Sequence, residues 1–322
     1  MGVSGTVIFV PFYTMVFPLL GHHLEPVQAV EVGLLTEIFG FISSTSAFWR
    51  AGLIDFQIAG FAVLFAAPTA ILGGYASHFL PGSWLLALIG VALVVFAFLL
   101  VRETTEVTHA TSQGAAASNT KKHSDRLGRI YRYRVLNDFW RGSSAGFGGL
   151  LQGLVGFSAG ELSTVEQVLR GIPVRIAAGN SHLIIAAASI SAAAAHLTVS
   201  ATQGTQVPWN LVAITIPAVL IGGQVAAILA GRIPQHTLRL ALAGFLTFIG
   251  ALSGYRASVG MGVHLPAWAL WTSVILCLAA MAVFIRRRSR SETCPVSAGT
   301  CASCGPRDTY AKDARTQGEP NP

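Results

Sequence analysis

The feature that most constrains this 322-residue chain is a series of apolar blocks, each long enough to cross a lipid bilayer as an α-helix. Crossing takes roughly 20 residues. Only 11% of the residues are charged, whereas a soluble domain carries about 25%. We therefore predict an all-α, polytopic helical membrane protein whose partner is the lipid bilayer. The blocks lie near residues 2–20, 27–48, 56–76, 82–101, 143–169, 174–198, 209–231, 236–254 and 266–285.

The net charge of +7 does not indicate nucleic-acid binding. Most Lys and Arg residues lie in two short tracts, one between the apolar blocks and one after them. Orientation in a membrane explains such tracts better than nucleic acid does. No groove-reading or base-stacking motif accompanies the charge. We expect no nucleic-acid partner.

Cysteine usage and motif content do not favour an enzyme. Cys277 lies in an apolar block, and Cys294, Cys301 and Cys304 lie in the polar tail. The pair Cys301-x-x-Cys304 has a redox or metal spacing, but a closed zinc site needs about four ligands. We find no nucleophile–base pair, metal ligand set or nucleotide motif. We expect no catalytic residues, no metal and no cofactor.

The two parts of the chain on either side of residues 102–142 resemble each other. Each part has a glycine turn near its start, then a block that begins with Pro, then a Pro-x-x-x-x-Gly-Gly segment. This is an internal duplication, the usual build of secondary transporters, although a duplication can also be purely architectural. The matching pairs are Gly2–Gly5 with Gly156–Gly160, Pro26 with Pro173, and Pro68–Gly74 with Pro217–Gly223.

The distribution of Lys and Arg predicts that the first block of each half does not cross the membrane. If all nine blocks cross, the basic residues divide almost equally between the two sides. If the first block of each half enters and turns back, every Lys and Arg except Arg256 falls on one side. Positive residues collect in cytoplasmic loops. Three crossings per half is an odd number, so the halves are inverted repeats.

These patterns divide the chain into five segments. Each repeat has a re-entrant or broken first helix plus three spans. We expect an interfacial helix between Leu127 and Arg141, where aromatic residues mix with Arg. The first repeat begins directly on its glycine turn, so we expect an N-terminally truncated chain. The segments are a first transmembrane repeat (1–101), a cytoplasmic basic linker with the interfacial helix (102–142), a second transmembrane repeat (143–254), a loop and final transmembrane helix (255–285) and a disordered cytoplasmic tail (286–322).

The order of these motifs resembles the sulfite exporter TauE/SafE family, also described as 4-toluene sulfonate uptake permeases. That family has a Gly-rich stretch near the start of each half, then a Pro-x-x-Ala segment, then Pro-x-x-x-x-Gly-Gly. The resemblance covers about residues 2–101 and 143–285. It implies transport of sulfur-containing anions such as sulfite, sulfonates or thiosulfate. Its motifs here are Gly2-Val-Ser-Gly5, Gly156-Phe-Ser-Ala-Gly160-Glu161 and Ala177-Ala-Gly-Asn180-Ser181.

The candidate substrate-binding residues lie at the two glycine turns. A half-helix that begins in mid-membrane points unpaired N–H groups and the positive end of its dipole into a cavity, which suits a small anionic substrate. Asn180 and Ser181 would add hydrogen-bond donors. The alternatives are tight helix packing through small residues and ordinary interhelical hydrogen bonds. The turn residues are Ser4, Gly5, Gly156, Ser158 and Gly160.

The ion-coupling candidates are Glu161, Glu31 and His182. Acids inside apolar blocks are costly and usually functional. Glu161 opens the second half-helix, where it would either carry a proton beside the anion or cap the helix. Glu37 follows Glu31 by six residues and faces another direction, so we do not expect both in one site. His182 would either relay a proton or be a bonded structural residue.

We therefore expect a secondary transporter of small anions that works by alternating access and is proton-coupled. It would lie in the cell inner (cytoplasmic) membrane as a multi-pass protein with its linker and C-terminus in the cytoplasm. The alternatives are a channel-like anion pore and a non-transport membrane scaffold. The sequence leaves open which anion is carried, the direction, the coupling ion and the oligomeric state.

Overall fold

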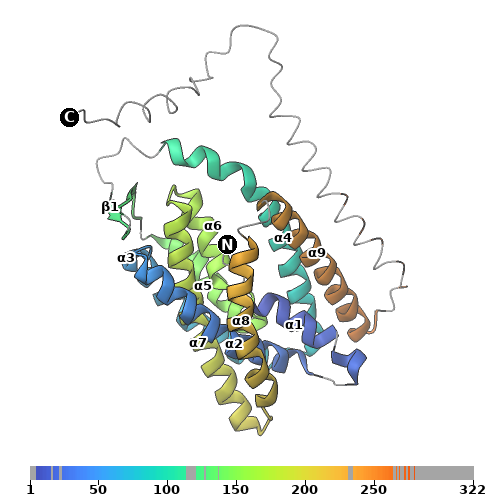
Figure 1. Ribbon diagram of the computed structural model, residues 1–322. Coiled ribbons are helices and arrows are strands. Elements are labelled where there is room, and N and C mark those ends of the chain that lie inside the picture. Colours follow the sequence, from blue (N-terminus) through green and yellow to red (C-terminus); the bar gives the residue numbers. More distant parts are fainter. Residues whose placement is uncertain are drawn as a thin grey trace, which may run out of the picture. The chain divides into compact units, whose positions relative to one another are not determined.

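The structure is a computed structural model, and it describes residues 5–15, 17–21, 24–113, 121–126, 128–136, 138–230, 235–263 and 266, with the single positions 268, 272, 275 and 279. Most of the predicted last span and the whole predicted tail lie outside the described residues, as does Ser4. The mainly helical build confirms the predicted fold class. The elements are α1 (Thr6–Met15), η1 (Phe17–Leu20), α2 (Pro26–Arg50), α3 (Phe56–Ser77), α4 (Gly82–Gln113), β1 (Lys121–Ser124), β2 (Ile130–Tyr133), α5 (Phe139–Val155), α6 (Ala159–Leu169), α7 (Val174–Gln203), α8 (Trp209–Ala230) and α9 (Gln235–Gly260) (Figure 1).

Three described helices, α2, α3 and α7, are long and apolar enough to cross a membrane. Shorter apolar stretches lie in α4 and α8. Local signals set where the long helices start. Pro26 stands at the start of α2 behind a capping box made by Glu25 and Gln28, and the Asp55 side chain accepts the N–H of Gln57 at 3.0 Å at the start of α3. Both arrangements satisfy helix donors that would otherwise lack a partner.

The most extensive helix pairings in the described part join the two predicted halves. Helix α3 packs on α5 and α7, α2 packs on α7, and α4 packs on α9. Glycines bring α3 and α5 into backbone contact. A Cβ added to Gly73 would lie 2.2 Å from the Leu150 carbonyl oxygen, and one added to Gly153 would lie 2.1 Å from that of Ala70. Close approach through small residues is a common way for helices to associate in a membrane.

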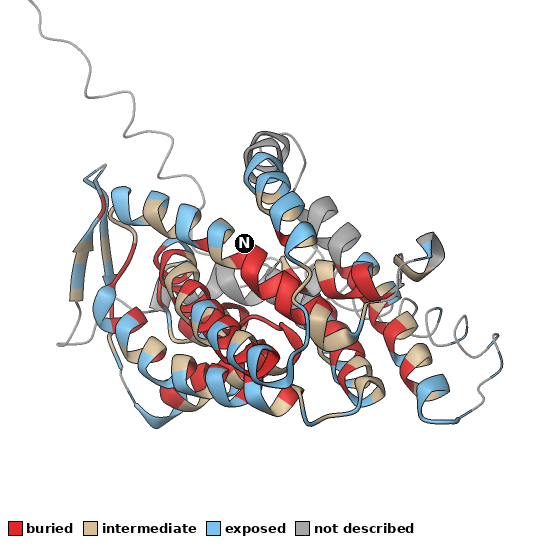
Figure 2. Ribbon diagram, turned by 90° about the horizontal axis from the view of Figure 1, so that it is seen from below, coloured by how far each residue is buried: buried red, intermediate tan, exposed pale blue. Residues whose placement is uncertain are grey.

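The burial pattern fits helices surrounded by lipid. Figure 2 shows buried residues gathered where helices face one another, with exposed residues along their outer sides. Large apolar side chains lie on those outer sides, including Leu64 at 67% and Ile214 at 69% exposure. In water such side chains would be an unfavourable surface, whereas lipid tails solvate them.

The structure contradicts the predicted interfacial helix between Leu127 and Arg141. Strands β1 and β2 form an antiparallel hairpin in which Lys121 lies opposite Tyr133. The side chains of β2 alternate between exposed and more buried positions, which is the period of a strand. Only the last part of the predicted segment is helical, because α5 begins at Phe139.

The hairpin docks on the ends of helices from both halves. Tyr133 joins a buried apolar cluster with Ile58 of α3 and with Ile172 and Ile176 around the start of α7. Lys121 forms an ion pair with Asp55 at 2.7 Å. Helix α4 continues to Gln113, so the first part of the predicted linker is helical. The linker is therefore partly an ordered structural element.

Candidate functional site

A break between α5 and α6 lies where the sequence predicts the second glycine turn. Helix α5 ends at Val155, and Gly156 adopts the left-handed conformation with φ 76°. This conformation is easy for glycine and costly for other residues. Ser158 then begins α6 as its N-cap. The two short helices therefore replace one continuous helix.

The start of α1 lies against this break. A Cβ added to Gly156 would lie 2.2 Å from Cγ2 of Thr6, and one added to Gly33 of α2 would lie 2.7 Å from the same atom. Thr6 also donates a hydrogen bond from Oγ1 to the carboxylate of Glu37. Both Thr6 and Glu37 are buried. Thr6, which directly follows Gly5, therefore lies against the second predicted glycine turn at Gly156.

The backbone donors at the tip of α6 are held by side-chain oxygens. The N–H of Ala159 donates to Gln152 Oε1 at 2.9 Å, and the N–H of Gly160 donates to Ser158 Oγ at 3.2 Å. Gln152 is completely buried, and its Nε2 donates to Ser189 Oγ of α7 at 2.6 Å. Two neutral side-chain oxygens therefore accept hydrogen bonds from the N–H groups that we predicted would bind an anion.

Gly160 and Ser181 lie together where α6 crosses α7. A Cβ added to Gly160 would lie 2.4 Å from Ile185 Cγ1 and 2.9 Å from the Ser181 carbonyl oxygen. The Ser181 hydroxyl is 2.5 Å from that of Thr164. Packing therefore requires a glycine here. The Ser181 hydroxyl therefore makes an ordinary interhelical hydrogen bond, the alternative to a role in anion binding.

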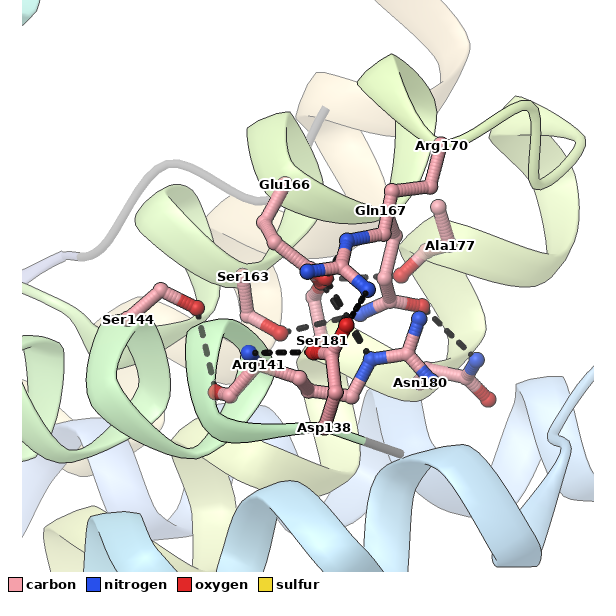
Figure 3. A network of polar contacts seen from close by, with 10 residues as sticks. All are labelled: Asp138, Arg141, Ser144, Ser163, Glu166, Gln167, Arg170, Ala177, Asn180 and Ser181. Atoms are coloured by element: carbon pink, nitrogen blue, oxygen red, sulfur yellow. Dashed lines mark hydrogen bonds and ion pairs between the residues drawn. The ribbon is translucent and has the colours of Figure 1, made fainter. Parts of the chain in front are cut away.

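Asn180 lies away from the α6 tip. Its Nδ2 donates to Gln167 Oε1 at 2.8 Å near the other end of α6 (Figure 3). Its Oδ1 accepts the backbone N–H of Asp55 at 2.7 Å. Gln167 in turn donates to Ser163 at 2.9 Å. Asn180 therefore joins the start of α3 to α6, and the structure does not bring it to the glycine turns.

A charged cluster ties the two arms of the broken helix together (Figure 3). Arg141 of α5 is only 1% exposed, and its Nε lies 3.4 Å from Glu166 of α6. Arg170 pairs with the same Glu166 at 2.5 Å and with Asp138 at 2.8 Å. Because α5 and α6 meet at both ends, their break has a defined geometry.

The three ion-coupling candidates lie in different places. Glu161 is buried in the first turn of α6. Glu31 accepts a hydrogen bond from Ser200 at 3.4 Å. Ser200 follows Ser181 on α7 by a distance of about 28 Å, at about 1.5 Å per residue. His182 Nδ1 donates to the Ala178 carbonyl oxygen at 2.7 Å. Only Glu161 lies near the break.

The structure adds residues that the sequence reasoning missed, above all Thr6, Gln152 and Glu37. Each is a polar residue within an apolar block, and Glu37 could have been preferred to Glu31 only with knowledge of the fold. Among the described residues, no group of three His, Cys, Asp or Glu side chains is arranged to hold a metal ion.

The cavity beside the break is small. Its cavity measures about 10 Å³, which is room for about one water molecule. A small oxyanion does not fit without movement of the surrounding helices. The lining residues are Thr6, Val10, Ile89, Ala92, Leu93, Val155 and Phe157.

A multi-pass helical membrane protein with a broken helix against a second helix start has the build of a membrane transporter. Residues 1–253 match the family model of the Sulfite exporter TauE/SafE, and the chain belongs to that family. It is 21% identical over 255 residues to the "Probable membrane transporter protein YunE" of Bacillus subtilis (strain 168). That match covers 78% of this chain and 89% of the relative. No solved structure matches the chain.

Proposed function

We propose that the protein is a secondary transporter of small sulfur-containing anions, such as sulfite, sulfonates or thiosulfate, that works by alternating access. The observation that carries the proposal is the contact between Thr6 and Gly156. It brings the start of α1 to the break before α6, deep among helices. Helix starts favour negative solutes. The family to which the chain belongs supports the choice of sulfur-containing anions.

The anion binds in this proposal by replacing side-chain oxygens at the tip of α6. Its oxygens take the N–H groups of Ala159 and Gly160, which Gln152 and Ser158 hold in the closed structure. The neutral acceptors keep these buried donors satisfied between transport cycles. The predicted residues Ser4, Gly5, Gly156 and Ser181 complete the site in this proposal, whereas Asn180 lies outside it.

Transport is coupled to protons in this proposal. A buried carboxylate is stable beside an anion only when protonated, so anion binding favours proton binding. Glu161 and Glu31 are the predicted coupling acids, with His182 as a relay. Glu37 joins them because its carboxylate accepts the hydrogen bond of Thr6 at the break.

The proposed setting is the cell inner (cytoplasmic) membrane, with inverted halves and with the linker and C-terminus in the cytoplasm. The positive linker supports this orientation. Arg256, the one basic residue that the charge pattern puts on the opposite side, donates to the Thr14 carbonyl oxygen at 2.6 Å. This hydrogen bond gives the Arg256 guanidinium a partner within the helix bundle.

Counterflow in liposomes tests the proposal. Vesicles with purified protein are loaded with unlabelled sulfite, thiosulfate, 4-toluenesulfonate or sulfate and diluted into the labelled anion. A carrier shows transient accumulation above equilibrium. Equilibration without that overshoot would indicate a pore, and no protein-dependent flux of any of these anions would overturn anion transport. The variant Gly156→Ala should lose flux, whereas Gly128→Ala in the linker, with the same φ of 76°, should keep it.

A further inference from the structure

Two histidines outside the proposed anion site form a direct hydrogen-bonded pair. His196 of α7 is completely buried, and its Nδ1 lies 3.1 Å from Nε2 of His78. Its Nε2 lies 2.9 Å from the Gly153 carbonyl oxygen of α5. His78 directly follows the end of α3 and is only partly buried. The pair therefore extends from the end of α3 into the interior of the helix bundle.

The positions of the hydrogens follow from these contacts. A carbonyl oxygen only accepts, so His196 carries its hydrogen on Nε2. Neutral His196 then accepts at Nδ1, and His78 donates from Nε2. All the bonds in this chain point the same way, from His78 to Gly153. Such a chain can pass a proton inward by exchanging its hydrogen bonds.

His196 belongs to a row of buried polar residues along one side of α7. The row connects α7 with four neighbouring helix segments, because each member has a partner on a different element. Gln152, which holds the tip of α6, is the partner next to the pair, and Glu31 of α2 is the partner on the other side. The members and their partners are Ser181 with Thr164, Ser189 with Gln152, His196 with His78, and Ser200 with Glu31.

The titratable groups around the pair are few among the described residues. Helix α2 contributes Glu31, through Ser200. Helix α3 contributes Tyr75, whose hydroxyl lies 3.1 Å from that of Thr198. Helix α5 contributes the uncharged Gly153 and Gln152. Glu31 is therefore the acid of this row nearest to a proton on the histidine pair.

We propose that His78 and His196 form the relay through which the coupling proton enters from the membrane face where α3 ends. A proton from water binds Nδ1 of His78. His78 then releases its Nε2 hydrogen to Nδ1 of His196 and remains neutral. His196 becomes an imidazolium that still donates to Gly153. The inference rests on the proposed proton-coupled transport and adds the residues that admit the proton.

This position gives the proton an effect on the anion site. Gly153 follows Gln152 directly, and Gln152 holds the Ala159 N–H at the tip of α6. A positive His196 adds a favourable charge beside a site for a negative solute. In a low-dielectric interior such an attraction is much stronger than in water. Proton uptake and anion binding therefore favour each other.

The pH dependence of transport tests the relay. The probe is labelled 4-toluenesulfonate, because a sulfonate stays ionised from about pH 5 to 8 and does not titrate itself. The variants His196→Gln and His78→Gln keep a hydrogen-bonding side chain but cannot carry the proton. His123→Gln is the matched control, since its Nε2 also contacts a carbonyl oxygen, that of Gly52 at 2.8 Å, but in the linker hairpin.

Each protein's uptake rate is measured between pH 6 and 8 and divided by its own rate at pH 8, with trapped pyranine reporting proton movement. The uptake rates of wild type and His123→Gln should rise by up to about tenfold for each unit by which the pH falls, as one bound proton allows. Both relay variants should lose this change and the pyranine signal. An unchanged pH profile in either variant would overturn the relay. If His196→Gln does not fold, His78→Gln at the helix end decides alone. Absence of wild-type counterflow would instead overturn the proposed function.

Discussion

Lys121 Nζ lies 2.7 Å from Oδ1 and 2.8 Å from Oδ2 of Asp55, so the linker hairpin is bound to the start of α3. Tyr133 donates a further hydrogen bond to Asp55 at 2.7 Å. Burial raises the pKa of Asp55, but the hydrogen bonds from Lys121 and Tyr133 and the lysine charge together hold it below its ordinary value. Burial and the neighbouring carboxylate both raise the pKa of Tyr133.

These shifts predict how hairpin docking depends on pH. A native pKa below the unfolded value of 3.8 stabilises the folded state above that pH. The contribution is lost as the pH falls through the lowered native pKa of Asp55. Thermal unfolding in detergent should therefore show no Asp55-dependent loss between neutral pH and pH 4, and a loss below it. Asp55→Asn should remove this part of the acid sensitivity.

The variant Lys121→Met should destabilise the docked hairpin. It removes a charged donor from a buried carboxylate, which costs about 1.5–3 kcal/mol. Lys122→Met is the control, because Lys122 is exposed on the same strand. Thermal unfolding and protease cleavage within the linker should both separate the two variants. Equal behaviour would show that the ion pair contributes nothing measurable to docking.

Gly156→Ala should destabilise the protein more than Gly128→Ala. Both glycines have φ 76°, and this left-handed conformation costs an alanine about 1–2 kcal/mol. At Gly128 the added Cβ meets nothing within 4 Å, whereas at Gly156 it would lie 2.2 Å from Thr6. The difference between the two unfolding temperatures isolates the contact of α1 with the break. Equal temperatures would contradict that contact.

Gly153→Ala should destabilise the α3–α5 contact. Its Cβ would lie 2.1 Å from the Ala70 carbonyl oxygen, and overpacking of this kind costs about 1–3 kcal/mol. Gly222→Ala in α8 is the matched control, because its Cβ meets nothing within 4 Å. Alanine favours a helix over glycine by about 1 kcal/mol, so the control should be unchanged or more stable. Thermal unfolding of both variants provides the comparison, and a stable Gly153→Ala would contradict the close approach.

Gln152→Glu should weaken anion transport through its effect on KM. A tethered carboxylate would accept the Ala159 N–H more strongly than the amide does and would compete with the substrate. We expect KM to rise by about tenfold, which corresponds to about 1.4 kcal/mol. Gln167→Glu is the control. Gln167 also donates to a buried serine and accepts an amide N–H, but it lies at the other end of α6. Equal KM values for the two variants would contradict the role of the α6 tip.

The sequence predicted the helices well because their signals are local. Pro26 and Asp55 mark helix starts, and Gly156 marks the break through its own conformation. The hairpin escaped prediction because β2 is short and its stability depends on docking against Ile58 and Ile172, which are distant in sequence. Its mixture of aromatic residues and Arg suits an interfacial helix equally well.

The candidate site was predicted only in part, for a similar reason. Gly156 and Ser158 follow from the turn pattern, but the importance of Thr6 depends on a contact across most of the first half of the chain. Asn180 and Ser181 are neighbours in sequence, yet Asn180 bonds to Gln167 and Ser181 to Thr164. Helical periodicity shows that adjacent residues point in different directions, but it does not show which distant side chains they meet.

The pairing of α3 with α5 has a consequence for how the protein is made. Gly73 belongs to the first predicted half, and the backbone that it contacts at Leu150 belongs to the second. Neither half therefore contains by itself the packing partner of this helix contact. The close packing of α3 can therefore form only after α5 has been synthesised. The two predicted halves share the order of their motifs, but the contact between α3 and α5 joins them in one folded unit.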